Sequence, residues 1–413
     1  MLQIAYETFT LDNGLKVVIH EDHSIPKAVM NILYRVGSKD EQAHRTGFAH
    51  LFEHLMFEGS KHIPHYDTPL QRVGGQNNAF TSSDITNYYL SLPANQLETA
   101  FWLESDRMLE LAFSQEKLDI QKSVVIEEYK QRYLNQPYGD AHIKLRGLHF
   151  QHHPYHWPTI GKDISHIEDA TLEEVMDFFF GYYAPNNATM VVAGDINRNE
   201  VLDLAEKWFG PIPSRKLKKQ PLPKEPEQKE AKTMTIEGDV PYTGIYKMYH
   251  IPAHTEEEYY IADILTDLLA NGKSSLLFQN MVKKAQVSPQ VNAFSWGFHD
   301  PGAISIDGKV ADGKTIKEFE DSLLETIEQL QSLTNEDLDR IKNKLESTFV
   351  MQKLTILNKA MGLAFSDTLG DIELVNKTTD IYRNISLDQV KTAAEKFLAP
   401  ENSSTLYYLP KSN

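Results

Sequence analysis

Hydrophobic positions along the chain follow two periods, and each period predicts one type of element. Short apolar runs, alternating with polar residues or bounded by turn residues, predict strands. Apolar residues spaced three and four apart predict helices, and Ser114 is the expected N-cap of one of them. The expected strands in the first half cover residues 15–20, 29–34, 88–92 and 190–193, and the long helical runs cover residues 95–112, 115–134 and 314–349.

The same succession of elements occurs twice. The segment from Leu172 to Ala184-Pro-Asn-Asn resembles the segment from Leu387 to Ala399-Pro-Glu-Asn, and both pairs of positions lie 215 residues apart. Each half is therefore expected to be α+β, with helices packed on one face of a mostly antiparallel sheet. A stretch rich in Pro and charge separates the halves and predicts an extended linker. The expected domains are residues 1–212, a linker at 213–232, and a homologous second domain at 233–413.

A run of apolar residues in the first half contains two His one helical turn apart. On a helix, His50 and His54 reach the same point, and two converging neutral imidazoles suit a zinc ion. Glu53 can reach a water bound to that ion and take its proton. The order His-x-x-Glu-His marks the inverted zincins. A chain with 16 His produces such a pattern by chance at times, but polar side chains beside a buried face need partners, which a metal supplies.

Two imidazoles and a water leave a zinc ion one protein ligand short. In the helix expected over residues 115–134, Gln121, Val124, Val125 and Glu128 share one face that should point inward. Glu128 is therefore the best candidate for the third ligand. Glu127 lies about 100° round the helix and is expected to be solvated. The alternative for Glu128 is an ordinary surface charge.

These residues belong to a longer resemblance. The chain resembles the pitrilysin and mitochondrial processing peptidase family over nearly its whole length, most of all the bacterial members with two homologous halves. The segments that carry the resemblance are residues 9–17, 50–54, 74–89, 124–128, 153–155, 160–161 and 184–195. The resemblance implies that His50, His54 and Glu128 bind zinc and that Glu53 is the base of a peptidase.

The resemblance also points to residues around the metal. The family often has a further acid one heptad before the ligand Glu; here that position is Gln121, which can support the ligands by hydrogen bonding but brings no charge. Residues 77–83 are a candidate edge strand, and in the family this region binds an extended peptide substrate through its main chain. The candidate substrate-binding residues are Asn78, Ala79, Phe80 and Thr81. The alternative is a plain structural strand.

The second half is expected to lack a metal site. Aligning the halves through Gly59 and Gly272 places Asp263, Thr266 and Asp267 at the motif positions. The helix is kept and the ligands are lost, so we expect one zinc ion per chain.

Peptidases of the family also need an Arg and a Tyr from a second half, their own or a partner's. Residues 233–413 contain only Arg340 and Arg383, and the expected strand at 302–309 offers only Lys309, whose point charge does not reproduce a guanidinium fork. We therefore expect the zinc-bearing subunit of a heterodimer, with a homologous subunit supplying the Arg and Tyr. A self-sufficient homodimeric peptidase and a non-catalytic scaffold subunit are the alternatives.

Composition excludes several classes. A net charge of −17 argues against binding to nucleic acid. The absence of Cys excludes disulfides, thiolate ligands and the Cys-dependent lyases of S-ribosylhomocysteine that share the inverted motif. No apolar run is long enough for a membrane span, and the N-terminus lacks a signal-peptide pattern, so the expected location is the bacterial cytoplasm or periplasm.

The remaining conspicuous side chains have simpler interpretations. The five His at positions 142, 149, 152, 153 and 156 are expected to be surface or turn residues, with a second metal site as the alternative. Met56, Phe57 and Trp102 are expected in the core.

Overall fold

The computed structural model describes residues 3–411, which form two compact units with one sheet each. Within the described residues, unit 1 comprises residues 3–129, 157–222 and 350–376. Unit 2 comprises residues 130–156, 223–349 and 377–411. The chain therefore passes between the units several times. The predicted α+β class is confirmed in both units.

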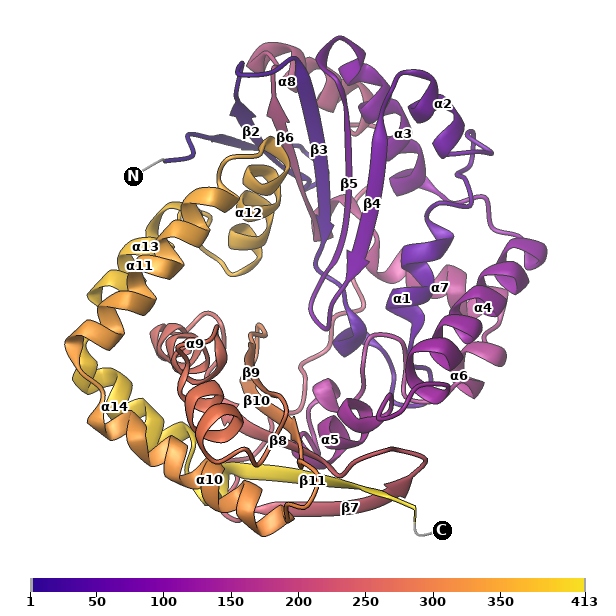
Figure 1. Ribbon diagram of the computed structural model, residues 1–413. Helices are drawn as coiled ribbons and strands as arrows, with labels where there is room; N and C mark the ends of the chain where they lie inside the picture. The colour runs from indigo at the N-terminus through magenta and orange to yellow at the C-terminus, as the bar shows by residue number, and fades with distance from the viewer. Residues whose placement is uncertain (1–2, 412–413) are drawn as a thin grey trace. The chain divides into compact units, whose positions relative to one another are not determined.

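Unit 1 is built on a six-stranded sheet in the order β1-β2-β6-β3-β5-β4 (Figure 1). Neighbouring strands are antiparallel except β2 and β6, which are parallel. The strands are β1 (Glu7–Thr10), β2 (Lys16–Glu21), β3 (Lys27–Tyr34), β4 (Gln76–Thr81), β5 (Thr86–Pro93) and β6 (Ala188–Gly194). The four strands predicted for this half are confirmed, and β4 is an edge strand, as expected.

The helices of unit 1 cover both faces of this sheet. Val29, Leu33 and Val191 pack against Leu363 of α12 on one face. Because side chains alternate along a strand, Met30 points to the other face, where α3 and α8 lie (Figure 1). The helices of this unit are α1 (Phe48–Leu55), α2 (Asp67–Arg72), α3 (Leu97–Leu109), α4 (Gln115–Tyr129), α6 (Ser165–Glu168), α7 (Leu172–Tyr182), α8 (Arg198–Trp208) and α12 (Ile356–Thr368).

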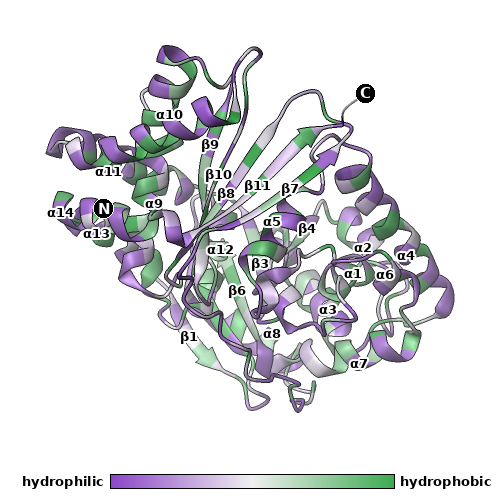
Figure 2. Cartoon of the chain, turned by 90° about the horizontal axis from the view of Figure 1, so that it is seen from below, coloured by the Kyte–Doolittle hydropathy of each residue, from purple (hydrophilic) through white to green (hydrophobic). Residues whose placement is uncertain are grey.

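Unit 2 repeats this plan with a five-stranded sheet in the order β7-β11-β8-β10-β9, in which only β7 and β11 are parallel. Leu145 of α5 packs on one face with Met248 and Leu406, and α9 packs on the other with Ile245 and Ile304. The strands are β7 (Lys232–Gly238), β8 (Gly244–Ile251), β9 (Val291–Trp296), β10 (Gly302–Lys309) and β11 (Ser403–Pro410). The helices are α5 (Ala141–His149), α9 (Glu257–Ala270), α10 (Ile316–Glu328), α11 (Asn335–Gln352), α13 (Leu374–Asn384) and α14 (Leu387–Phe397), of which α11 and α13 extend past the boundary with unit 1. Hydrophobic and hydrophilic residues alternate along α10 and α11 (Figure 2), as in helices with one buried face.

The two sequence halves exchange one helix each. The first residues of α5 and α12, Ala141 and Ile356, lie 215 residues apart, which is the spacing of the sequence repeat. Helix α5 comes from the first half and packs in unit 2, whereas α12 comes from the second half and packs in unit 1. The compact units therefore differ from the sequence segments 1–212 and 233–413 at these two places.

The linker is fixed at both ends. Arg215 donates to the carbonyl oxygens of Tyr183 and Leu109 in unit 1, each at 2.6 Å. In unit 2, the carboxylate of Glu225 accepts the backbone N–H groups of Gln151 and His152 at 2.9 and 2.8 Å, and that of His153. No regular element lies between α8 and β7. This segment thus has no helix or strand of its own, and its anchors are side chains.

Two expected helices differ from the structure. Ser114 caps α4 through the N–H of Lys117, as predicted, but the last turns of the expected run form a π-helix at Lys130–Leu134. The run expected at 314–349 was wrong as a single helix. It is divided between α10 and α11 because the chain turns at buried Leu333, and Thr334 caps the second helix by accepting the N–H of Asp337. Across residues 3–411, no helix is long and apolar enough to cross a membrane.

Candidate metal centre

Helix α1 presents the two His of the motif. The rings of His50 and His54 lie one turn apart, with centroids 4.9 Å apart and planes at 82°. The helix begins after Gly47, whose φ is +91°. A side chain at Gly47 would also meet Ile160 O at 2.7 Å, so this start of α1 requires glycine.

Glu128 on α4 completes a group of three. Its Oε2 lies 3.6 Å from His50 Nε2 and 3.5 Å from His54 Nε2. Ligands of a tetrahedral zinc ion are about 3.3 Å apart, given zinc–ligand bonds of about 2.0–2.1 Å. The spacing and the donor types therefore fit such an ion. Within residues 3–411, no other three His, Asp or Glu side chains converge in this way.

The inward face of α4 differs from the predicted one in one residue. Val125 is buried, as expected, but Val124 is 43 % exposed. The buried side of the helix runs through Leu118, Val125 and Tyr129, and Glu128 lies at its border. Glu127 is exposed, as predicted. The prediction for Val124 was wrong because a marginally apolar helix does not define its buried face to within one residue.

Gln121 connects the two helices of the site. Its Nε2 donates to Oε1 of Glu58, just past the end of α1, at 2.5 Å. Because Gln121 precedes Glu128 by two turns on α4, this bond fixes α4 relative to α1.

Glu53 is half-buried beside the edge strand. Burial raises the pKa of its carboxyl group, and the hydroxyl and backbone N–H of Thr81 oppose this rise. The neighbouring Glu128 raises the pKa further, whereas His54 lowers it. Glu53 therefore lies between the group of three and β4.

The free edge of β4 faces Glu53. Strand β4 is hydrogen-bonded only to β5. The N–H of Ala79 is bonded to the Oδ1 of Asn78 at 2.8 Å, so it points away from the ladder. Thr81, two residues later, points its N–H the same way, towards Glu53. Asn78 and Phe80 are exposed. A peptide added to this edge would run past Glu53.

A cluster of buried polar and aromatic side chains, from β5 and α3 among others, packs under α1. Tyr88 donates from its hydroxyl to the carbonyl oxygen of Phe52 at 3.1 Å. The guanidinium of Arg107 lies over the rings of Tyr88 and Tyr66, 4.5 and 4.6 Å from their centroids, and pairs with Glu104 at 2.7 Å. The sequence reasoning missed Arg107 and Glu104. Their spacing of three within a helix was a signal for a pair, but not for a buried one.

The corresponding helix of unit 2 holds no such group. Asp263, Thr266 and Asp267 lie on α9, which packs on β9 as α1 packs on β4. Asp263 accepts from Ser295 Oγ at 2.6 Å and from Tyr382 Oη at 2.7 Å, which is a structural role.

The two Arg of the second half are engaged at the surface. Arg340 bonds Ser274 Oγ at 2.8 Å, and Arg383 is paired with Glu346. The Nζ of Lys309 lies 4.6 Å from the ring centroid of Tyr138.

The prediction that the five His are surface or turn residues was wrong for His149, which is buried on α5, whereas His152 is exposed and His153 lies in the turn after α5. His149 and His153 are buried, because α5 and the turn after it pack inside unit 2. His149 stacks on His250 with 3.6 Å between ring centroids. Of the expected core residues, Met56 is fully buried, whereas Phe57 and Trp102 are partly buried.

Comparison with known proteins identifies the family. The family model described as Insulinase (Peptidase family M16) matches residues 16–150, and the model described as Peptidase M16 inactive domain matches residues 169–345. The zinc protease PqqE of Helicobacter pylori is 28 % identical over 98 % of this chain and 93 % of that protein. The chain belongs to peptidase family M16. The expected resemblance to pitrilysin-like peptidases is thereby confirmed.

Other relatives agree with the M16 assignment. An uncharacterized zinc protease of Bacillus subtilis, YmxG, is 24 % identical and covers 83 % of each chain. The crystal structure of a protease from Helicobacter pylori superposes with a TM-score of 0.92 at 27 % identity, covering 99 % of this chain and 100 % of that one. The M16 fold is therefore present over the full described length.

Proposed function

We propose that this M16 family member is a zinc-dependent endopeptidase with its zinc bound by His50, His54 and Glu128. One observation carries the proposal: three donor side chains converge beside Glu53 and the free edge of β4. The names of the relatives, which are called zinc proteases, support the choice of metal. We propose one such ion per chain, since within residues 3–411 no second group of three His, Asp or Glu side chains converges.

Each residue of the site has a chemical role in this proposal. A zinc ion, when bound, supplies Lewis-acid chemistry that makes a water acidic and polarises a carbonyl group. Glu53 takes the proton of the attacking water and passes it to the leaving amine. Gln121, through Glu58, holds α4 and α1 at a fixed separation.

The proposed substrates are extended oligopeptides or unfolded protein segments. Asn78, Ala79, Phe80 and Thr81 offer a main-chain edge, to which a peptide adds by backbone hydrogen bonds with little demand on its sequence. The catalytic half corresponds to residues 1–212, and the second half, 233–413, is homologous and without ligands.

The proposed assembly is a heterodimer in which this chain bears the zinc. Arg340 and Arg383 are engaged in surface contacts, and Lys309 lies against Tyr138. Both guanidinium groups are thus already engaged, and Lys309 offers only a point charge. A homologous subunit would then supply the Arg and the Tyr. The cytoplasm or periplasm of a bacterium remains the predicted location.

The decisive experiment compares the zinc-loaded chain with its Glu53→Gln variant on a pool of mixed oligopeptides, read by mass spectrometry. We expect Glu53→Gln to bind zinc as the wild type does and, wherever the wild type cleaves, to lose about 10²–10⁴-fold in rate, the usual contribution of a general base. Zinc content measured on both proteins is the control.

The outcomes separate the alternatives. Cleavage by the chain alone that depends on Glu53 would support the peptidase and contradict the need for a partner. Zinc binding without cleavage would direct the search to a homologous subunit. A protein that takes up no zinc would contradict the proposal and favour a scaffold subunit.

A further inference from the structure

Glu41 has a buried carboxyl group beside the N-terminus of α1, the helix that carries His50 and His54. It is 7 % exposed. Its Oε2 accepts the N–H of Gly47 at 2.9 Å, and its Oε1 accepts the N–H of Ala49 at 2.8 Å. The indole N–H of Trp157 lies against the same carboxylate. One side chain thus accepts hydrogen bonds from two backbone N–H groups at the start of α1.

This contact compensates for a missing cap. The first N–H groups of any helix lack partners within the helix, and a side chain at the N-cap normally accepts one of them. The N-cap of α1 is Gly47, which has no side chain to do so. Glu41, six residues upstream, supplies both acceptors from outside the helix.

The two amides that Glu41 binds lie close to His50 in the chain, which connects Glu41 with the candidate metal site. Ala49 is bonded to His50 in the chain, and the same turn sets the direction of His50 towards Glu128 Oε2. A first turn that loosens or rotates would separate His50 from His54 and Glu128. Tyr88 supports α1 at Phe52, near its C-terminal end, whereas Glu41 holds its N-terminal end together with the packing of Phe48 on Phe178.

We propose that Glu41 is a positioning residue for the metal centre, which orients His50 by holding the first turn of α1. This inference rests on the proposed zinc function of His50, His54 and Glu128. Glu41 touches neither the ligands nor the substrate edge, and it acts through the backbone of Gly47 and Ala49.

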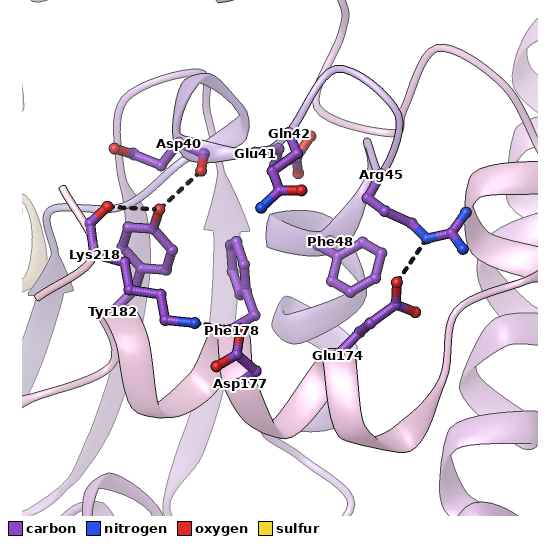
Figure 3. A pocket seen from close by; sticks show the side chains of 10 residues that line it. All are labelled: Asp40, Glu41, Gln42, Arg45, Phe48, Glu174, Asp177, Phe178, Tyr182 and Lys218. Atoms are coloured by element: carbon purple, nitrogen blue, oxygen red, sulfur yellow. Dashed lines mark hydrogen bonds and ion pairs between the residues drawn. The ribbon is translucent and has the colours of Figure 1, made fainter. Parts of the chain in front are cut away.

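A small cavity beside Glu41 makes the inference testable by chemical rescue. The cavity has a volume of about 100 Å³ and is lined by Glu41, Gln42, Phe48 and Phe178, among others (Figure 3). The ion pair of Arg45 with Glu174 at 2.9 Å borders it. Removing the Glu41 side chain would join its space to this cavity, so formate could enter and present a carboxylate to the two amides.

The matched control is Asp40, the neighbouring carboxylate. Asp40 lines the same cavity, but its carboxyl group accepts the N–H of Gly37 at 3.0 Å instead of an amide of α1. Asp40→Asn and Glu41→Gln therefore make the same change, from a carboxyl group to an amide, at adjacent positions. In Glu41→Gln, one acceptor becomes an N–H₂ group that opposes an N–H of the helix.

The experiment measures zinc affinity by chelator competition, the visible spectrum of the Co²⁺-loaded protein, and hydrogen exchange of residues 47–51 in zinc-free protein. We expect Glu41→Gln and Glu41→Ala to lose about 10- to 100-fold in zinc affinity, as when residues that orient metal ligands are removed. Exchange in α1 should quicken, the Co²⁺ bands should shift, and kcat should fall more than KM rises. Formate should restore Glu41→Ala in part, and Asp40→Asn should match the wild type.

The results distinguish the failure of this inference from that of the proposed function. Wild-type affinity and spectrum in Glu41→Gln, or equal losses in Asp40→Asn, would overturn the positioning role. Destabilisation without a spectral shift or formate rescue would also overturn it. If the wild type binds no zinc, the proposed function fails, while hydrogen exchange still reports on Glu41 and α1.

Discussion

At the scale of single residues, α1 is supported by two charged side chains whose burial could not be predicted from the sequence. Arg107 and Glu104 are 1 % and 2 % exposed and pair with each other on α3. Tyr66 donates its hydroxyl to the same carboxylate, and the guanidinium lies between aromatic rings. The pair is thus buried inside unit 1, where each charge has few other groups with which to pair.

Removal of one charge from this pair should be costly. We expect Arg107→Met to lower the free energy of unfolding by about 3–5 kcal/mol, because it leaves Glu104 buried and unpaired. The double variant Arg107→Met with Glu104→Gln should recover part of this loss, since a neutral amide can still accept from Tyr66. Urea unfolding of the three proteins measures both values. A single variant within 1 kcal/mol of the wild type would contradict the prediction.

The residues found from the sequence and those missed differ in how they act. In the proposed site, His50, Glu53, His54 and Glu128 would act through side chains on helices, so their helical spacing was visible in the sequence. Glu41 acts on main-chain amides from a loop, and no periodic pattern marks such a contact. Arg107 resembled a solvated helix charge, because the burial of α3 depends on neighbours far away in the sequence.

At the scale of elements, the edge strand β4 is the proposed docking edge for substrate. Its residues alternate between exposed and half-buried, and its outward amides at Ala79 and Thr81 lead to Glu53. A peptide that binds the Ala79 N–H takes the place of Asn78 Oδ1, which accepts it at 2.8 Å. Neither Asn78 nor Phe80 needs to contact the substrate through its side chain. The docking strength should therefore depend on main-chain donors.

Ala79→Pro tests this dependence. The substitution removes the outward N–H and leaves the bonds to β5 intact, and Pro is tolerated on an edge strand when its N–H side faces outward. We expect KM for an oligopeptide to rise about two- to tenfold, the value of one hydrogen bond, with kcat and zinc content little changed. Ala79→Ser, which keeps the amide, should match the wild type. An unchanged KM in Ala79→Pro would argue against docking on this edge.

The strands and helices were predicted correctly where the hydrophobic residues follow a clear period, and incorrectly where a helix breaks. The strands β2, β3, β5 and β6 follow from their apolar runs. The break between α10 and α11 was missed, although Thr334 and Asp337 have the spacing of a helix cap. The π-helix after α4 has no sequence signal that single-chain reasoning can use.

At the scale of the whole molecule, unit 2 contains an acid-sensitive contact. His149 on α5 stacks on His250 on β8. Burial lowers the pKa of His149 well below its usual value and that of His250 to about 4. Glu225 favours protonation of His250, whereas Lys232 opposes it for both rings. His149 Nδ1 contacts Ser404 Oγ at 3.1 Å.

The sign of the pH effect follows from these shifts. Below about pH 6.5 the unfolded chain takes up protons that the folded rings refuse, so stability falls as the pH drops towards 4. From pH 7.5 to pH 5, His250 alone should account for a loss of about 2 kcal/mol. We expect His250→Phe to flatten the pH dependence of unfolding by about this amount, as measured by urea titration at both values. Equal slopes for the two proteins would contradict the assignment.

The repeat of 215 residues revealed two halves but not their exchange of helices. Ala141 and Ile356 begin equivalent helices, and either helix has an apolar face suited to either sheet. Sequence periodicity describes the face of a helix and not the sheet that it covers. Only the packed structure shows that α5 belongs to unit 2 and α12 to unit 1.

The exchange of α5 and α12 changes what a cut in the backbone can do. A protease that severs the linker near residue 220 produces two fragments, each of which contains a helix packed on the other fragment's sheet. Neither fragment can leave without uncovering Leu33 on one sheet or Leu406 on the other, so the nicked protein should migrate as one particle until denaturant is added. A cell that degrades loose fragments would therefore treat the nicked protein as it treats the intact one.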